Sequence, residues 1–260
     1  YPKGLERTNG NTRRIYANAK HNDCNLLFQH QRAREILGKS RTSAHKQTIK
    51  ELLDMRQGLT ANIDAIIEQV AYLECIKPYV LCGGTALAMQ IGHRKSEDLD
   101  FMMWRKSKTE KPEIDWNNIE KELSEKIGEI ENFNMLGFDQ VEFLVKGVRF
   151  SFFVSDNLSP VTTPIAYLGN IRLADVESIM AMKMEVMLRR MKFRDYYDIY
   201  CILLKGYSIH KGIEKALKLS RHRLLTKNII AMLLGGQFIP DNNFATLEPK
   251  YEVTKELGPE

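Results

Sequence analysis

Two aspartates separated by one residue, Asp98 and Asp100, are the side chains whose type and spacing best suit metal-assisted chemistry. They lie in the segment DLDFMM at 98–103, whose apolar residues predict a strand. Because successive strand side chains point to opposite faces, both carboxylates are expected on one face. Neighbouring carboxylates repel each other unless a cation lies between them, and hard oxygen ligands of this kind suit Mg²⁺.

A glycine turn stands shortly before this strand. The run YVLC at 79–82 predicts a short buried strand, and Gly83 and Gly84 let the backbone turn sharply and approach a ligand. Thr85 is expected to cap a helix over 86–92, whose free N–H groups and positive dipole end favour a phosphate. A bare aspartate pair is more often solvated, but the strand–helix–strand context favours a phosphate and metal site.

Three regions of different composition divide the chain. Residues 1–43 predict a polar, basic arm, residues 44–173 an α/β core, and residues 174–260 a helical C-terminal region. A long helix is expected over 44–73, because apolar residues recur there at helical spacing, with Gly58 as a point where it breaks or kinks. The basic arm has two interpretations, a solvated extension or a contact with RNA, and the solvated extension is the commoner.

The rest of the core alternates between helix and strand patterns. A helix is expected from Asp115 or Asn117 to about Ile130. A hairpin follows over 138–145 and 148–154, with a glycine in its tight turn. One more short strand is expected within 165–173.

Charged side chains stand at unusual positions in the predicted C-terminal helices. Asp175 caps a helix over 176–190, and Lys183 falls on its apolar side. A lysine there is costly unless it snorkels or meets an anion, and snorkelling is the commoner outcome. Asp195 and Asp198 lie one turn apart on the next helix, near its start, where favourable interaction with the helix dipole is an alternative to chemistry.

The composition bounds the class of protein. Of 260 residues, 43% are hydrophobic and 27% charged, as in an ordinary globular protein, and the net charge of +5 permits a nucleic-acid partner without requiring one. The four cysteines are scattered without a CxxC pair, which fits a reducing cytoplasm. The sequence has no HExxH, GxxxxGK(S/T), GxGxxG or GxSxG motif, which argues against zinc-protease, P-loop, Rossmann and serine-hydrolase sites.

No apolar run of membrane-spanning length and no signal peptide is found, so we expect no membrane contact. The chain begins with Tyr1 rather than methionine. We therefore expect the native protein to start upstream, and a removed leader stays open.

Three separated segments together resemble one protein family. They are GGTALAMQIGHRKSEDLDF at 83–101, GVRFSFF at 147–153 and IRLADVESIMAMKMEVMLRRMKFRDYYDIY at 171–200. Over roughly residues 79–205 the chain is similar to the AbiEii/AbiGii-type nucleotidyltransferase toxins of the DNA polymerase β-like nucleotidyltransferase superfamily. The resemblance implies an α+β fold, in which a small mixed sheet flanked by helices is followed by a helical C-terminal part.

The resemblance assigns roles to the residues of the first segment. Gly83, Gly84 and Thr85 match the turn that holds the nucleoside triphosphate. Asp98 and Asp100 match the catalytic carboxylates that bind the metal.

The remaining motif residues are assigned in the same way. Lys183 matches a catalytic lysine that also binds the nucleotide phosphates, and Asp195 matches the catalytic aspartate of the fourth motif. Arg94 and Ser96 belong to the nucleotide-binding motif, and the resemblance gives neither a specific role.

Ser151 departs from the superfamily pattern. Many polymerase β-like enzymes carry a third carboxylate on the strand after the aspartate pair, here 148–154, and Ser151 stands at that position. Three explanations stay open: Asp195, Asp156 or Glu142 completes the site, metal binding is weaker, or the chemistry is atypical.

The activity implied by the resemblance is Mg²⁺-dependent transfer of a nucleoside monophosphate from an NTP to an acceptor hydroxyl on RNA or tRNA. The protein would be a cytoplasmic toxin with a cognate antitoxin protein. Ser151 motivates the main alternative, a catalytically weak or inactive nucleotide- or RNA-binding member of the same fold. A housekeeping transferase without toxicity and, lower, a phosphohydrolase using the same acidic pair are further alternatives.

Overall fold

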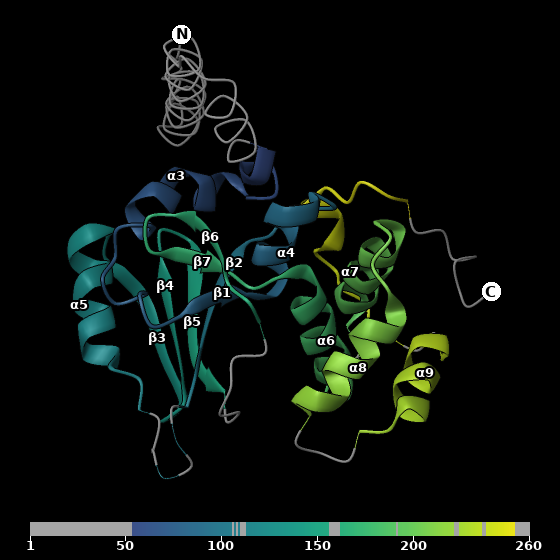
Figure 1. Ribbon diagram of the computed structural model, residues 1–260. Coiled ribbons are helices and arrows are strands. Elements are labelled where there is room, and N and C mark those ends of the chain that lie inside the picture. The colour runs from purple at the N-terminus through teal and green to yellow at the C-terminus, as the bar shows by residue number, and fades with distance from the viewer. Residues whose placement is uncertain are drawn as a thin grey trace, which may run out of the picture. The chain divides into compact units, whose positions relative to one another are not determined.

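A seven-stranded mixed sheet and a group of helices beside it make up the part of the chain that the structure describes (Figure 1). The structure is a computed structural model, and it describes residues 54–105, 107, 109, 113–155, 162–190, 192–220, 224–235 and 238–252. The predicted arm at 1–43 lies outside the described residues, as do residues 44–53 of the predicted long helix.

The described elements have the following bounds. The strands are β1 (Val80–Cys82), β2 (Asp98–Trp104), β3 (Ile130–Gly137), β4 (Gln140–Val145), β5 (Val148–Ser155), β6 (Ile165–Leu168) and β7 (Ile171–Leu173). The α-helices are α3 (Ala61–Val70), α4 (Gly83–Ile91), α5 (Trp116–Lys126), α6 (Val176–Met187), α7 (Phe193–Leu204), α8 (Ile209–Leu219) and α9 (Thr226–Leu234). A 3₁₀ helix, η1, spans Phe244–Leu247.

Strand β2 lies in the middle of the sheet, whose order is β3-β4-β5-β2-β1-β7-β6. It pairs antiparallel with β1 on one side and parallel with β5 on the other. Strands β4 and β5 form an antiparallel hairpin, and Lys146 and Gly147 between them both have positive φ, 50° and 67°, as a tight hairpin turn requires. The predicted hairpin is therefore confirmed.

One face of β2 and β5 belongs to the hydrophobic core. Leu99 and Phe101 on β2 and Phe150 and Phe152 on β5 are buried in the core. The rings of Phe101 and Phe152 stack with their centroids 5.2 Å apart. Because strand side chains alternate, Asp98 and the neighbouring polar residues must occupy the opposite face.

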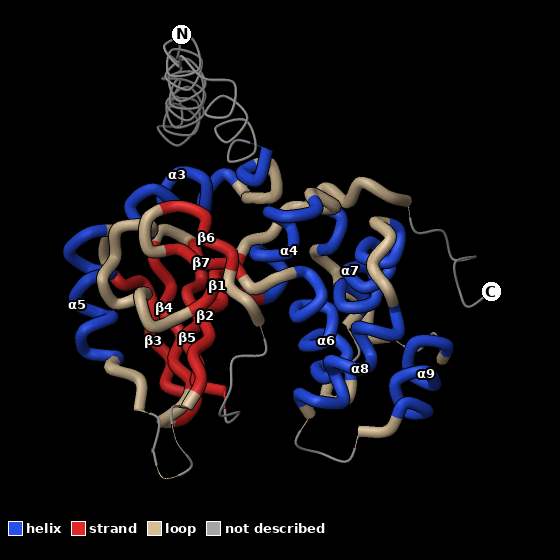
Figure 2. The backbone as a smooth tube through the Cα atoms, in the orientation of Figure 1, coloured by secondary structure: helices blue, strands red, loops and turns tan. Residues whose placement is uncertain are grey.

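The helices α6 to α9 gather beside the sheet, with α4 between the two (Figures 1 and 2). Asp175 caps α6, as predicted, because its side chain accepts a hydrogen bond from the Ser178 N–H. Helix α8 packs closely on α6, since a Cβ added at Gly212 would lie 2.7 Å from Met180 Sδ. The predicted boundary at 173/174 coincides with the change from β7 to α6, and the division into domains stays a prediction.

The helix predicted over 44–73, with Gly58 as the point where it breaks, is interrupted there in its described part, so the break at Gly58 is confirmed. Helix α3 begins only at Ala61, and Gly58 lies so close to the Ala88 backbone that an added Cβ would collide with it. Leu59 then forms a β-bridge with Ser96. The chain leaves the helix there because this contact ties it to the loop before β2.

Two strand assignments differ from prediction. The predicted helix over 115–130 ends at Lys126, and β3 follows. Strand β3 is an edge strand with no buried residue, so its hydrophobic alternation is weak. The single strand expected within 165–173 is a hairpin of β6 and β7, with Gly169 at φ +52° in its turn.

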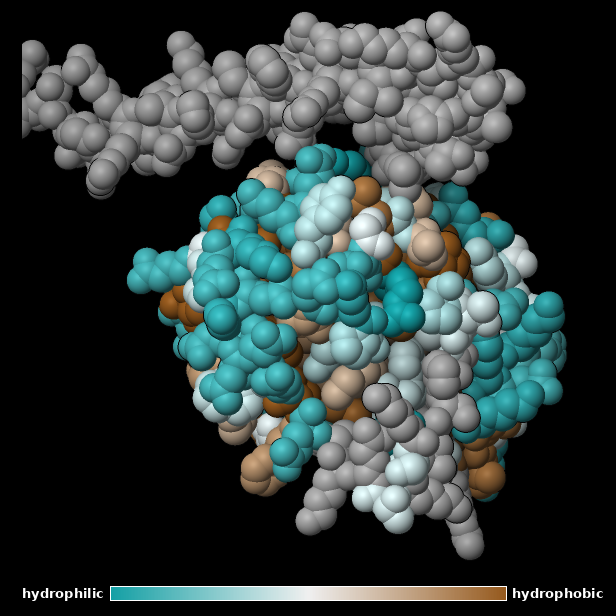
Figure 3. Space-filling model, turned by 60° about the vertical axis from the view of Figure 1, so that its left-hand side comes forward, coloured by the Kyte–Doolittle hydropathy of each residue, from teal (hydrophilic) through white to brown (hydrophobic). Residues whose placement is uncertain are grey.

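The face of the molecule in Figure 3 is largely hydrophilic, with smaller hydrophobic patches between the polar side chains. No helix among the described residues is both long enough and apolar enough to cross a membrane.

Candidate active site

The two aspartates of β2 lie on the sheet face opposite the core. Asp98 is paired with Arg149 of β5, with Arg149 Nε 3.0 Å from Asp98 Oδ1. Asp100 is half-buried, and burial, followed by the charge of Asp98, raises the pKa of its carboxyl to about 6. A hydrogen bond from the Ser151 hydroxyl opposes this rise. The pair therefore carries negative charge that a cation would stabilise.

The start of α4 lies directly against these carboxylates. The helix begins at Gly83, and Cys82 at its N-cap position offers no side-chain hydrogen bond. The first N–H groups of a helix have no partner within it, so the N–H groups of Gly83 and Gly84 suit an anion. Gly83 has φ +68°, and an added Cβ would collide with the Asp100 carboxylate. Only glycine allows this close approach.

Thr85 has a different place from the one expected. It is the third residue of α4 rather than its cap, it is fully buried, and its hydroxyl donates a hydrogen bond to the Asp98 carbonyl oxygen. The capping prediction is wrong because the turn after β1 starts the helix three residues earlier than predicted, at Gly83. The Thr85 hydroxyl joins α4 to β2, while its backbone N–H still belongs to the first helical turn.

A buried ion network lies behind the first turn of α4. Asp198 of α7 accepts two hydrogen bonds from Arg94, at 2.7 Å from Nε and 2.8 Å from Nη2. Lys183 Nζ and His93 Nε2 each lie 2.6 Å from its carboxylate. Burial alone would raise the pKa of Asp198, but Arg94 and Lys183 outweigh it and hold the pKa well below its usual range.

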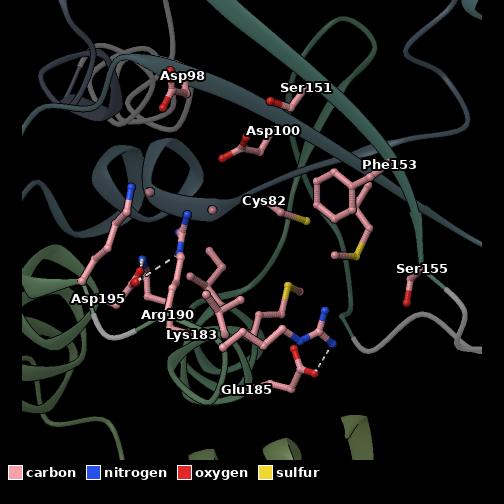
Figure 4. A pocket seen from close by; sticks show the side chains of 18 of the residues that line it. Cys82, Asp98, Asp100, Ser151, Phe153, Ser155, Lys183, Glu185, Arg190 and Asp195 are labelled. Atoms are coloured by element: carbon pink, nitrogen blue, oxygen red, sulfur yellow. Dashed lines mark hydrogen bonds and ion pairs between the residues drawn. The ribbon is translucent and has the colours of Figure 1, made fainter. Parts of the chain in front are cut away.

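Lys183 connects this network to a second aspartate, Asp195. Its Nζ lies 3.1 Å from Asp195 Oδ1, so the lysine bridges Asp195 and Asp198. Asp195 is 1% exposed, and its Oδ2 has no hydrogen-bond partner among the described residues, although Arg190 Nε lies 3.4 Å away. Figure 4 shows Lys183 of α6 and Asp195 of α7 near Arg190 of the linker between these helices. The lysine thus meets anions rather than snorkelling to solvent.

One groove of about 1420 Å³ brings most of the predicted residues together. Single small-molecule sites typically enclose roughly 300–1,000 Å³, so this groove has room for more than one ligand. The predicted residues that line it are Gly83, Gly84, Arg94, Ser96, Asp98, Asp100, Lys183 and Asp195. Thr85 does not line it, in keeping with its burial.

Sequence reasoning missed the parts of the site that depend on pairing across the chain. Arg149 neutralises Asp98 only because β5 lies parallel to β2 with these two residues in register. Asp198 was noted, but its role as the centre of an ion network was not. A signal was available for Arg149, because it alternates with Ser151, which was predicted to stand at the position of a third carboxylate of the site.

Asp98 and Asp100, which line the groove, fit a magnesium ion bound together with substrate phosphates. Within the described residues, no group of three His, Cys, Asp or Glu side chains lies close enough to hold a metal by itself. Mg²⁺ usually takes one or two carboxylates plus phosphates and waters, which Asp98 and Asp100 satisfy. Ser151 pairs in register with Asp100 and with Glu142 of β4, which also lines the groove. Asp156 lies outside the described residues.

Comparison with known proteins gives the family of the chain. Residues 71–246 match the family model described as the nucleotidyl transferase AbiEii toxin of type IV toxin–antitoxin systems. An uncharacterised protein of Aquifex aeolicus (strain VF5), aq_aa25, is 27% identical over 199 residues, which are 74% of this chain and 89% of that protein.

Solved structures are more distant. The nucleotidyltransferase toxin MenT4 of Mycobacterium tuberculosis is 18% identical, with a TM-score of 0.46 over 84% of this chain and 85% of that one. JHP933 of Helicobacter pylori is 19% identical, with a TM-score of 0.37 over 72% of this chain and 89% of that one. The family match covers more than half of the sequence. The chain therefore belongs to the AbiEii nucleotidyltransferase toxin family and is a nucleotidyltransferase.

Proposed function

We propose that this protein transfers a nucleoside monophosphate from an NTP to a hydroxyl group of RNA, with Mg²⁺ held by Asp98 and Asp100. The observation that carries the proposal is the position of this carboxylate pair. It lies against the start of α4, which has no side-chain cap, and it lines the same groove as Lys183. Bound magnesium would neutralise phosphate charge and ease deprotonation of the acceptor hydroxyl.

The side chains of this protein would bind and orient the triphosphate. The N–H groups of Gly83 and Gly84 would donate hydrogen bonds to its phosphate oxygens. Lys183, which the carboxylates of Asp195 and Asp198 hold in place, would neutralise charge that develops as pyrophosphate leaves the α-phosphorus.

Two residues of the motif would act indirectly. Arg94 is 4% exposed and donates hydrogen bonds to the Asp198 carboxylate and the Lys95 carbonyl oxygen, so its role would be to support the groove wall beside Gly84 rather than to bind a phosphate. A Cβ at Gly84 would lie 2.5 Å from Arg94 Nη2 and 3.1 Å from Ser96 Oγ. Both residues thereby fix the first turn of α4.

Basic side chains between α6 and the first turn of α7 support an RNA acceptor. Arg189, Arg190 and Lys192 of the linker and Arg194 of α7 all line the groove, and cations in such an arrangement attract a phosphate backbone. A cognate antitoxin protein, which the family description implies, would be the protein partner in a cytoplasmic system.

A panel of α-labelled NTPs, supplied with Mg²⁺, total RNA and the protein itself, tests the proposal. We expect label on RNA with wild type and none with Asp100→Asn. Glu125→Gln, which removes an exposed carboxylate of α5 outside the groove, should transfer label normally.

Ser151 favours a second candidate, binding of nucleotide or RNA without transfer, because it stands beside Asp100 where a third carboxylate would be expected. NTP binding by the wild type without label on any acceptor would favour that candidate. Full activity of Asp100→Asn would contradict the assignment of the metal site.

A further inference from the structure

The groove face of β2 and β5 changes from charged to apolar along its length. In register, the pairs are Asp98–Arg149, Asp100–Ser151, Met102–Phe153 and Trp104–Ser155. All eight residues line the groove. Two residues beyond Asp100 along β2, the groove is therefore lined by the apolar pair of Met102 and Phe153 instead of a carboxylate.

Phe153 is the aromatic residue of β5 that faces the groove rather than the core. Phe150 and Phe152 are fully buried, whereas Phe153 is partly exposed. Figure 4 shows its ring directed into the pocket, on the same side of the sheet as Asp100 and Ser151. A partly exposed ring beside a phosphate and metal site offers a stacking surface for a planar group.

Helix α6 supplies the opposite wall of this apolar section. Ile179, Met182 and Val186 line the groove at helical spacing, next to Lys183 on the same helix. The apolar wall and the lysine thus share one helix, and Phe153 and Asp100 share two adjacent strands. A single ligand lying between the sheet and α6 would contact both sections.

The spacing suits a nucleotide. Two residues along a strand span about 6.6 to 6.8 Å, which separates the Asp100 and Met102 positions. In a nucleotide the base and the α-phosphate are held apart by one ribose, a separation of similar scale. An α-phosphate at Asp100 would therefore leave its base at the apolar pair.

We propose that the base of the donor nucleoside triphosphate stacks on the ring of Phe153, between the sheet and α6. The inference rests on the proposed function, because it takes the phosphates to lie at Asp98, Asp100 and the start of α4. Phe153 is accordingly a substrate-binding residue whose loss weakens nucleotide affinity and leaves the phosphate site intact.

Steady-state transfer kinetics of three variants test the assignment. Phe153→Leu keeps apolar bulk but removes the ring, and we expect the KM for the NTP to rise about tenfold, because base–aromatic stacking contributes on that scale. Phe153→Tyr keeps the ring and should stay within about twofold of wild type. Phe133→Leu, at an aromatic residue of β3 that packs on Trp116 outside the groove, should leave the KM unchanged.

Two kinetic outcomes would overturn the inference. One is an unchanged KM for the NTP in Phe153→Leu. The other is a rise confined to the KM for the RNA acceptor, which would place an acceptor base, not the donor base, on the ring.

Equilibrium binding separates this inference from the proposed function. Wild type should bind an NTP about tenfold more tightly than tripolyphosphate, which has no base, and Phe153→Leu should lose that preference while its tripolyphosphate affinity stays constant. This result supports the stacking site even if no transfer is observed, in which case only the proposed function fails. Equal affinity of the wild type for NTP and tripolyphosphate overturns the stacking site, whatever the transfer activity.

Discussion

At the scale of single residues, the half-buried carboxyl of Asp100 links the metal site to stability. Its pKa of about 6, against an ordinary 3.8, means that the folded protein retains a proton there which the unfolded chain releases. In the metal-free protein, ionisation of this carboxyl therefore lowers the free energy of unfolding as pH rises from about 4 to 6. The charged carboxylate continues to destabilise the fold at higher pH.

Asp100→Asn should consequently raise the melting temperature of metal-free protein at pH 7. The free energy of unfolding should rise by about 1–3 kcal/mol at pH 7, and this difference from wild type should vanish near pH 4. Added Mg²⁺ should raise the melting temperature of wild type and not of the variant, as thermal melts in both conditions would show. Lower stability of Asp100→Asn at pH 7 would mean that the carboxylate is already compensated without metal.

The pKa of Asp198 is shifted in the opposite direction from that of Asp100, because Arg94 and Lys183 keep its carboxylate ionised although it is fully buried. Asp198→Asn leaves those cations short of a counter-charge and should cost about 3–5 kcal/mol of the free energy of unfolding. Urea denaturation measures this cost. Glu185→Gln breaks the exposed pair with Arg189 and should cost under about 1 kcal/mol. Similar losses in both variants would contradict the network as a buried structural unit.

At the scale of elements, the start of α4 depends on a glycine that only the three-dimensional structure explains. Gly83→Ala meets both a positive φ and the Asp100 carboxylate, whereas Gly206→Ala meets a positive φ of 85° with no atom within 4 Å. Both variants should lose about 1 kcal/mol to backbone strain. Only Gly83→Ala should also lose NTP binding, measured by titration calorimetry. Equal NTP affinity in the two variants would remove α4 from the phosphate site.

How far the sequence predicted these elements depended on the range of the interactions involved. The aspartate pair, the glycine turn and the β4–β5 hairpin were predictable because each is encoded within a few consecutive residues. The Arg94–Asp198 pair spans 104 positions, and no local pattern announces it. Strand β3 was missed because an edge strand leaves much of its apolar surface exposed, including Leu136 at 60%.

At the scale of the whole molecule, the family membership leads to a prediction for cells. Induced expression should arrest growth if the transfer activity acts on cellular RNA, and Asp100→Asn should not. Growth curves with matched protein levels measure this. Equal arrest by both proteins would mean that toxicity does not depend on the carboxylate pair, and normal growth with both would favour a housekeeping transferase.

The measurement that tests the central claim most directly compares NTP labelled at the α-phosphate with NTP labelled at the γ-phosphate. Nucleotidyl transfer at Asp98 and Asp100 predicts α-label on the RNA acceptor and γ-label in released pyrophosphate, both absent with Asp100→Asn. Transfer of γ-label to the acceptor, or its release as inorganic phosphate, would contradict the account and make the groove a phosphotransferase or phosphohydrolase site.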